Sequence, residues 1–174
     1  IVATGSSPTK LSGLPDDPRI INSTGALDLE NIPERLLVIG GGIIGLEMAS
    51  VYAELGSRVT IVELTPNLMF GADQDLVMPL ENKISKRLEA VYKETQVVAI
   101  DTDIDALVVS LDGADVPSKA AFDKVLVAVG REPNGSKINS DAAGLVLSDK
   151  GFIEVDGQMR TNISHIYAIG DVVG

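Results

Sequence analysis

Apolar runs and helical spacing alternate along this chain, and the sharpest pattern lies in its first third. Residues 36–39 are all apolar, which is typical of a strand buried on both faces of a sheet. Helical spacing follows over residues 43–55, with Gly56 just past the end, where glycine commonly terminates a helix. A second, mostly apolar run over residues 58–63 predicts the next strand. This strand–helix–strand order predicts an α/β fold built on a parallel sheet.

Downstream of these elements the pattern predicts one long helix and an antiparallel meander. Asp73 is placed to cap a helix that runs to about Lys93, and Pro79 should kink or delay it because proline lacks a backbone donor. The apolar stripe of this helix consists of Leu76, Leu80, Ile84, Leu88 and Val91. Short strands follow over residues 96–100, 106–111 and 116–129, with Asp112-Gly113 as a hairpin turn, and two more over residues 152–155 and 166–169.

The beginning of the chain carries weaker patterns. Residues 1–3 read as the end of a strand, and residues 7–22 as a connector because they hold three prolines and show little periodicity. Ser23 is predicted to cap a short helical turn through Leu29, which Pro33 ends.

The stretch between the first strand and its helix carries candidate chemistry. Gly40, Gly42 and Gly45 fit the spacing G-x-G-x-x-G, and Glu63 ends the second strand. In this arrangement the first glycine allows a tight turn, the second leaves room for a pyrophosphate, and the third lets the helix pack closely on the sheet. The helix then presents free N–H groups and the positive end of its dipole to the phosphates. We therefore predict a Rossmann-like dinucleotide site; the alternative is a tight βα turn that holds no ligand.

Glu63 is predicted to decide which dinucleotide binds. A carboxylate at this position accepts hydrogen bonds from the adenosine ribose hydroxyls and repels the 2′-phosphate of NADP. No arginine or lysine follows within the next few residues to hold that phosphate. The predicted ligand is therefore NAD(H), against the alternative of a carboxylate that only ends a strand in solvent.

Composition and charge disfavour several other classes of function. The net charge of −11 would repel nucleic acid and anionic membranes. The chain has no cysteine and one histidine, so it supplies no disulfide or thiolate chemistry, and we predict no metal site. No apolar run reaches the ~18 residues that a membrane span needs, and no signal peptide is visible, so we expect a cytoplasmic location. The chain opens at Ile1 without a methionine, and both ends read as interior sequence, so we expect a piece of a longer protein.

Three further segments do not fit a lone nucleotide fold but resemble one family. They are residues 3–6 (Ala-Thr-Gly-Ser), 130–134 (Gly-Arg-Glu-Pro-Asn) and 161–171 (Thr-Asn-Ile-Ser-His-Ile-Tyr-Ala-Ile-Gly-Asp). In order and spacing they are similar to motifs of the pyridine nucleotide–disulfide oxidoreductases, and the resemblance covers essentially the whole chain. It implies a homodimeric flavoprotein that uses FAD, a redox disulfide and NAD(H), with this chain as its NAD-binding portion.

The resemblance also implies roles for individual residues. It matches Glu47 to a glutamate beside the nicotinamide, although on physical grounds alone Glu47 is an acid that the helix dipole would favour. It matches Asp171 to an aspartate that holds the ribityl chain of FAD, although a Gly-Asp after a strand is more often a turn. The remaining matches are Gly40, Gly42, Ile43, Ile44 and Gly45 for the pyrophosphate turn, Glu63 for the ribose, and Val97 and Gly130 for the adenine pocket.

We therefore predict a Rossmann-like parallel sheet with helices on both faces and an inserted antiparallel β-meander, flanked by remnants of an FAD domain. The expected domains are residues 1–33 (end of the FAD domain and connector), 34–131 (NAD-binding domain) and 132–174 (return segment of the FAD domain). In the family, the FAD glycine turn and the cysteine pair precede the position of Ile1, and a catalytic His-Glu pair follows that of Gly174. The chain alone is thus predicted to be inactive, and His165 is expected to be a surface or turn residue.

Two alternatives stay open at this point. The chain could belong to a sibling flavoprotein such as an NADH oxidase or a mercuric reductase, which the missing cysteine motif would distinguish. It could also be a stand-alone NAD(H)-binding module with a regulatory role, which would need a closed hydrophobic surface.

Overall fold

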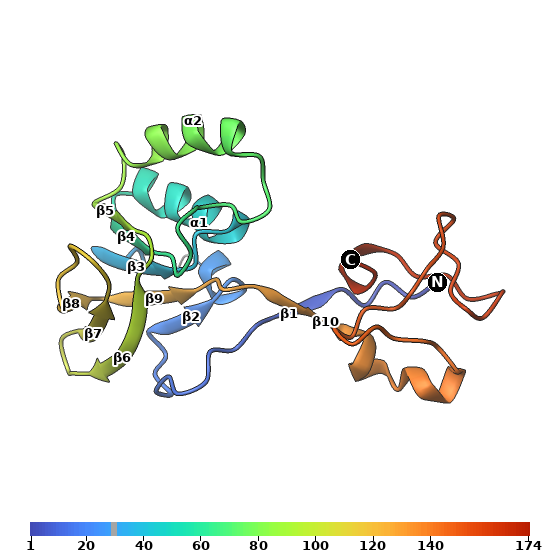
Figure 1. Ribbon diagram of the computed structural model, residues 1–174. Helices are drawn as coiled ribbons and strands as arrows, with labels where there is room; N and C mark the ends of the chain where they lie inside the picture. The colour runs from blue at the N-terminus through green and yellow to red at the C-terminus, as the bar shows by residue number, and fades with distance from the viewer. Residues whose placement is uncertain (29–30) are drawn as a thin grey trace. The chain divides into compact units, whose positions relative to one another are not determined.

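The computed structural model describes residues 1–28 and 31–174, which form two compact units (Figure 1). Residues 10–130 make up the larger unit, and residues 1–9 together with 131–174 make up the smaller one. The three domains expected from the sequence stay a prediction. Among the described residues, no helix is long and apolar enough to cross a membrane.

The larger unit is built on a five-stranded sheet in which every neighbouring pair of strands is parallel. Its strands lie in the order β2-β9-β3-β4-β5 and comprise β2 (Ile20–Asn22), β9 (Lys124–Val127), β3 (Arg35–Ile39), β4 (Arg58–Val62) and β5 (Ala90–Tyr92). The predicted α/β class is confirmed. The segment 20–22, which we expected to be connector, is an edge strand of this sheet.

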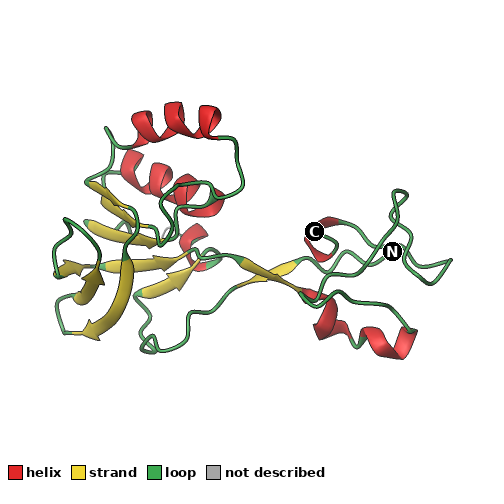
Figure 2. Cartoon of the chain, viewed as in Figure 1, coloured by secondary structure: helices red, strands yellow, loops and turns green. Residues whose placement is uncertain are grey.

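One face of the sheet is covered by helices (Figure 2). Leu36 and Val38 of β3 point to this face and pack in one buried cluster with residues of α1 (Ile43–Glu54) and α2 (Gln74–Ile84). The helix predicted to follow the glycines is therefore confirmed, and Gly56 follows it with a φ of +101°. Tyr52 is fully buried in this cluster, and its hydroxyl donates to the carbonyl of Ala26 at 2.8 Å.

The other face differs from the prediction, because the meander covers it and helices do not. Leu37 and Ile39, which alternate with the helix-facing residues, pack against Leu107, Val109 and Phe122. These come from the antiparallel strands β6 (Gln96–Thr102), β7 (Leu107–Asp112) and β8 (Lys119–Phe122). The three-stranded sheet presents one apolar face of its own, which is sufficient to bury the second face of the parallel sheet.

The long helix expected over residues 73–93 is shorter in the structure. Asp73 takes the N-cap position without a side-chain cap, α2 continues through Pro79 and ends at Ile84, and residues 90–92 form β5. The predicted stripe is wrong in part, since Leu76 and Leu80 are exposed. Pairing of β5 with β4 supplies backbone hydrogen bonds and burial that outweigh helical spacing in this segment. The structure gives no physical account of Pro79 inside α2.

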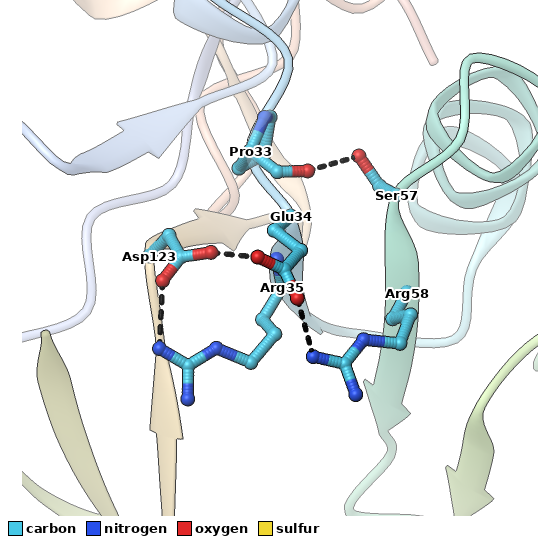
Figure 3. A network of polar contacts seen from close by, with 6 residues as sticks. All are labelled: Pro33, Glu34, Arg35, Ser57, Arg58 and Asp123. Atoms are coloured by element: carbon cyan, nitrogen blue, oxygen red, sulfur yellow. Dashed lines mark hydrogen bonds and ion pairs between the residues drawn. The ribbon is translucent and has the colours of Figure 1, made fainter.

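The single strand expected over residues 116–129 is two strands, β8 and β9, which belong to different sheets. Asp123 separates them and binds the start of β3 (Figure 3). Its carboxylate accepts the Arg35 N–H at 2.7 Å and the Arg35 guanidinium at 2.8 Å. Burial raises the pKa of Asp123, and the hydrogen bonds from Arg35 lower it by more, so the net pKa is below its ordinary value. The charged Asp123 thus fixes the point where the chain changes sheets.

Neighbouring contacts at the same edge tie β3 to β4. The Arg58 guanidinium donates to Glu34 at 2.7 Å, and the Ser57 hydroxyl donates to the carbonyl of Pro33 at 2.5 Å (Figure 3). The expected helical turn after Ser23 is a 3-10 turn over Gly25–Leu27, and its predicted end at Leu29 lies outside the described residues.

The smaller unit contains little regular structure. The strand β1 (Ser6–Pro8) pairs antiparallel with β10 (Arg131–Pro133), and 3-10 turns occupy Asn134–Ile138, Ser140–Ala143 and Gly170–Val172. The strands expected near residues 1–3, 152–155 and 166–169 are isolated bridges, Val2 with Ala168, Leu147 with Ile153, and Arg160 with Tyr167. Their apolar side chains still form the core, with Leu145, Ile153, Ala168 and Val172 buried together. His165 lies exposed in a turn, as expected.

Candidate functional site

The glycine turn leaves the sheet where the carboxyl ends of three parallel strands meet. Gly40 is buried, donates its N–H to the Val62 carbonyl of β4 at 2.8 Å, and adopts a φ of +110° that disfavours any side chain. A Cβ at Gly40 would also overlap the carbonyl of Ala128, just past β9. After β3 the chain continues to β4 on one side of it, and it later returns to form β9 on the other side. The end of β3 is therefore the point where the strand order reverses, which is where α/β sheets place ligands.

The other two glycines of the motif differ in their surroundings, and the predicted role of Gly42 toward a pyrophosphate stays a prediction. A Cβ at Gly45 would overlap the carbonyl oxygen of Gly40, so only glycine lets α1 pack this closely on the end of β3. Gly42 is different: no other part of the described chain comes within 4 Å of the position that its Cβ would take. The space above Gly42 is therefore open, and a ligand can approach the backbone there.

Backbone donors gather at that open space. The first intrahelical hydrogen bond of α1 runs from the Leu46 N–H to the Gly42 carbonyl at 3.0 Å. No described residue accepts a hydrogen bond from the N–H groups of residues 42–45, which are the donors that a helix start leaves unpaired. Ile43 is 62% exposed and Ile44 is half-buried, so solvent reaches this turn. The arrangement can bind an anionic group of a ligand.

Glu63 follows β4 directly, and its half-buried carboxylate is held by the backbone N–H groups of Gly41 and Thr65. The Oε2 atom accepts the N–H of Gly41 at 2.6 Å. The Oε1 atom accepts the N–H of Thr65 at 2.8 Å. The Thr65 hydroxyl lies 2.7 Å from Oε1 and 2.8 Å from the Asn67 carbonyl, and it donates its one hydrogen to one of these two acceptors. The structure therefore brings Glu63 to the glycine turn and engages it with the protein itself, while its predicted contact with ribose stays a prediction.

Gly41, which the motif leaves as an unspecified residue, was missed by the sequence reasoning. It is buried, and both its backbone groups are engaged: its N–H donates to Glu63, and its carbonyl accepts the Met69 N–H at 2.9 Å. A Cβ there would overlap the buried side chain of Leu68 and press on Glu63. The available signal was the run of three glycines, of which the motif explains only two.

The other predicted site residues of the larger unit are Glu47, Val97 and Gly130, and each lies in a different part of the chain. Glu47 is exposed on α1, one turn beyond its start and not in its first turn, so the dipole contributes less to it than expected. Val97 is half-buried in β6, two residues past Thr95, whose N–H donates to the Glu63 carbonyl at 3.0 Å. Gly130 follows β9, is exposed, and has a φ of +136°. Their roles stay predictions.

Asp171 belongs to the smaller unit, in the 3-10 turn Gly170–Val172. Its exposed carboxylate accepts the Ser6 hydroxyl at 2.6 Å and lies 3.7 Å from the Arg131 guanidinium. Arg131 also donates to the hydroxyl and the carbonyl of Ser6, so the three residues form one polar cluster beside β1 and β10. An exposed, charged carboxylate of this kind can accept hydrogen bonds from the hydroxyl groups of a ligand.

The parallel sheet and its glycine turn define a protein of the Rossmann-like α/β class. The chain belongs to the pyridine nucleotide–disulphide oxidoreductase family, whose pattern it matches over residues 1–174, so the resemblance seen in the sequence is confirmed. It is 49% identical over 176 aligned positions to the dihydrolipoyl dehydrogenase of Vibrio parahaemolyticus and 47% identical over 175 positions to that of Haemophilus influenzae. These alignments cover 100% of this chain but only 37% and 36% of the two relatives.

Solved structures agree with this assignment of family. LpdA from Mycobacterium tuberculosis superposes with a TM-score of 0.84 at 30% identity, covering 99% of this chain and 37% of that protein. The HOCl-induced flavoprotein disulfide reductase RclA from Escherichia coli superposes with a TM-score of 0.82 at 29% identity, covering 97% of this chain and 38% of that protein.

Proposed function

We propose that this chain is the NAD(H)-binding portion of a dihydrolipoyl dehydrogenase. The observation that carries the proposal is the open space above Gly42, where the N–H groups of residues 42–45 have no described acceptor and Glu63 stands at the neighbouring strand end. The curated relatives named above support the choice of family member. Residues 33–48 and 23–27 also resemble that enzyme more than its siblings.

The residues present fit a dinucleotide at this turn. The N–H groups of residues 42–45 would bind the pyrophosphate, with the exposed Ile43 and the half-buried Ile44 beside it, while Gly40 and Gly45 hold the turn close to the sheet. Glu63 would accept a hydrogen bond from the adenosine ribose, and Val97 and Gly130 would line the adenine pocket. Glu47 would lie beside the nicotinamide. When bound, NAD⁺ supplies the hydride acceptor, which the protein only binds and orients.

The proposed reaction of the whole protein is the oxidation of dihydrolipoamide to lipoamide with reduction of NAD⁺ to NADH, using FAD and a redox disulfide. Asp171 would contribute to FAD binding through its exposed carboxylate. The chain contains no cysteine, so the disulfide has to come from residues outside it. We further propose a homodimeric, cytoplasmic enzyme that acts within 2-oxo-acid dehydrogenase complexes.

A sibling flavoprotein is the second candidate, favoured by the similar superposition on RclA. NADH oxidases and mercuric reductases belong to the same alternative. Turnover of dihydrolipoamide with NAD⁺ by the whole protein distinguishes dihydrolipoyl dehydrogenase from these siblings.

The nucleotide assignment is tested by titrating the chain with NADH and NADPH in a calorimeter. Because Glu63 is an acid and no cation follows it closely, NADH should bind at least tenfold more tightly, a difference of about 1.4 kcal/mol. Equal affinities for the two nucleotides would contradict the role of Glu63, and no binding of either would contradict the proposed function.

A further inference from the structure

The carboxylate of Glu63 is hydrogen-bonded to the protein itself before any nucleotide arrives. An ionised carboxylate offers about four acceptor positions. The N–H groups of Gly41 and Thr65 use two of them here, and the Thr65 hydroxyl lies within reach of a third. Each oxygen has one backbone donor, so Oε2 keeps a position for a ribose hydroxyl. A residue that only contacted ribose would not need such contacts with the glycine turn.

These contacts join two segments that are far apart in the sequence. Gly41 lies in the glycine turn, and Thr65 lies in the loop that leaves β4. Met69, in the same loop, donates its N–H to the Gly41 carbonyl, and Leu68 packs where a Gly41 side chain would lie. Gly41 is thus fixed from both sides by residues 63–69, while the N–H groups of residues 42–45 have no acceptor among the described residues.

We propose that Glu63 fixes the shape of the glycine turn, in addition to contacting ribose. We call its hydrogen bonds with Gly41 and Thr65 the latch. The Oε2 atom of Glu63 fixes Gly41 and its Oε1 is fixed by Thr65, so that the free donors of residues 42–45 are held ready for the pyrophosphate. Glu63 and Thr65 are then positioning residues for the phosphate site as well. This inference rests on the proposed binding of NAD(H) at this turn.

The latch requires a carboxylate and not merely an acceptor of the same size. In Glu63→Gln one oxygen becomes an NH₂ group, which would face either the Gly41 N–H or the Thr65 N–H, donor against donor. The amide would still be able to hydrogen-bond a ribose hydroxyl. The two roles of Glu63 therefore predict different results for this variant.

ADP and 2′,3′-dideoxyadenosine diphosphate separate the two roles, because they share the pyrophosphate and the second lacks both ribose hydroxyls. We expect Glu63→Gln to weaken binding of the dideoxy compound about tenfold, equivalent to 1.4 kcal/mol. Glu94→Gln is the matched control, because it makes the same chemical change and removes one negative charge near the same loop. The backbone N–H of Glu94 donates to the Thr65 carbonyl. Unchanged affinity for the dideoxy compound in Glu63→Gln would overturn the proposal.

A measurement without ligand separates the latch from the proposed function. In amide NMR spectra, the Gly41 N–H should be shifted downfield by its short bond to Glu63 and protected from exchange. Thr65→Val, which keeps the shape and the charge of the site, should speed exchange at Gly41 and Thr65, and Thr65→Ser should restore the wild-type rates. Equal exchange rates at Gly41 and Thr65 in Thr65→Val and wild type would refute the latch even if NADH binds. Failure of the wild type to bind NADH would refute the proposed function.

Discussion

Replacing Gly42 by valine separates nucleotide binding from folding. Gly42 has a φ of −80° and a ψ of −174°, an extended conformation that every residue adopts. No other part of the described chain comes within 4 Å of the position of a new Cβ. The added side chain would therefore meet open space in the free protein and would stand in the path of the pyrophosphate in the complex.

Two small effects on folding nearly cancel in this variant. Replacing a glycine reduces the conformational freedom of the unfolded chain. This stabilises the folded protein by about 0.4–1 kcal/mol where the native backbone suits the new residue. Loss of glycine at an N-cap costs roughly the same amount. We therefore expect the free energy of unfolding of Gly42→Val to stay within about 1 kcal/mol of the wild-type value.

The effect on binding is much larger. Hydrogen bonds to charged groups contribute about 1.5–3 kcal/mol each, and the valine would separate the phosphate from several of the donors at residues 42–45. The loss of only two such bonds would weaken NADH binding at least hundredfold, about 2.7 kcal/mol.

Calorimetric titration with NADH and urea denaturation measure the two effects on the same samples. Gly157→Val is a suitable control, because Gly157 also has open space around its missing side chain and belongs to the smaller unit. Wild-type affinity in Gly42→Val would show that the pyrophosphate binds elsewhere. A loss of more than about 2 kcal/mol in stability would show that the space above Gly42 is not open.

Three other predictions concern different parts of the chain. Gly45→Ala should lower the free energy of unfolding in urea by about 1–3 kcal/mol, because the new Cβ overlaps the Gly40 carbonyl and forces α1 away from β3; an unchanged midpoint would contradict this packing. The hydrogen bonds from Arg19 hold the pKa of Asp17 at about 2, against 3.8 ordinarily. The stability that this pair contributes is therefore complete above pH 3.8 and is lost as the pH falls to about 2. In an NMR titration Arg19→Met should return the Asp17 pKa toward 3.8, and an unchanged pKa would refute the pairing. The purified chain should be colourless and inactive with dihydrolipoamide and NAD⁺, because it has no cysteine and Asp171 alone contributes too few bonds to retain FAD; a visible flavin spectrum or turnover above the blank would contradict this.

Local signals determined the central part of the fold. The strand β3, the glycine turn, α1 and β4 were predicted within a residue or two, because an apolar run, a glycine-rich turn and helical spacing are properties of neighbouring residues. The roles of Gly40 and Gly45 in close packing were also readable, since the motif is itself defined by backbone approach. The spatial openness above Gly42 followed from the same reasoning.

Tertiary structure decided where partners outside the local segment compete with local preference. Residues 90–92 continue a helical pattern but become β5 because β4 offers them a parallel neighbour, and β2 was missed because its pairing with β9 lies far along the chain. A charged pair at Arg35 and Asp123 sets the break between β8 and β9. No period within residues 116–129 encodes that break, because the partner of Asp123 lies in β3.

The same distinction applies to the candidate site. The sequence alone identified Glu63 as the acid that ends the second strand, because its position relative to the glycines is a matter of spacing. It gave no reason to connect Glu63 with Gly41 and Thr65. That connection exists only because β3 and β4 lie side by side, so that the loop after one strand reaches the turn after the other.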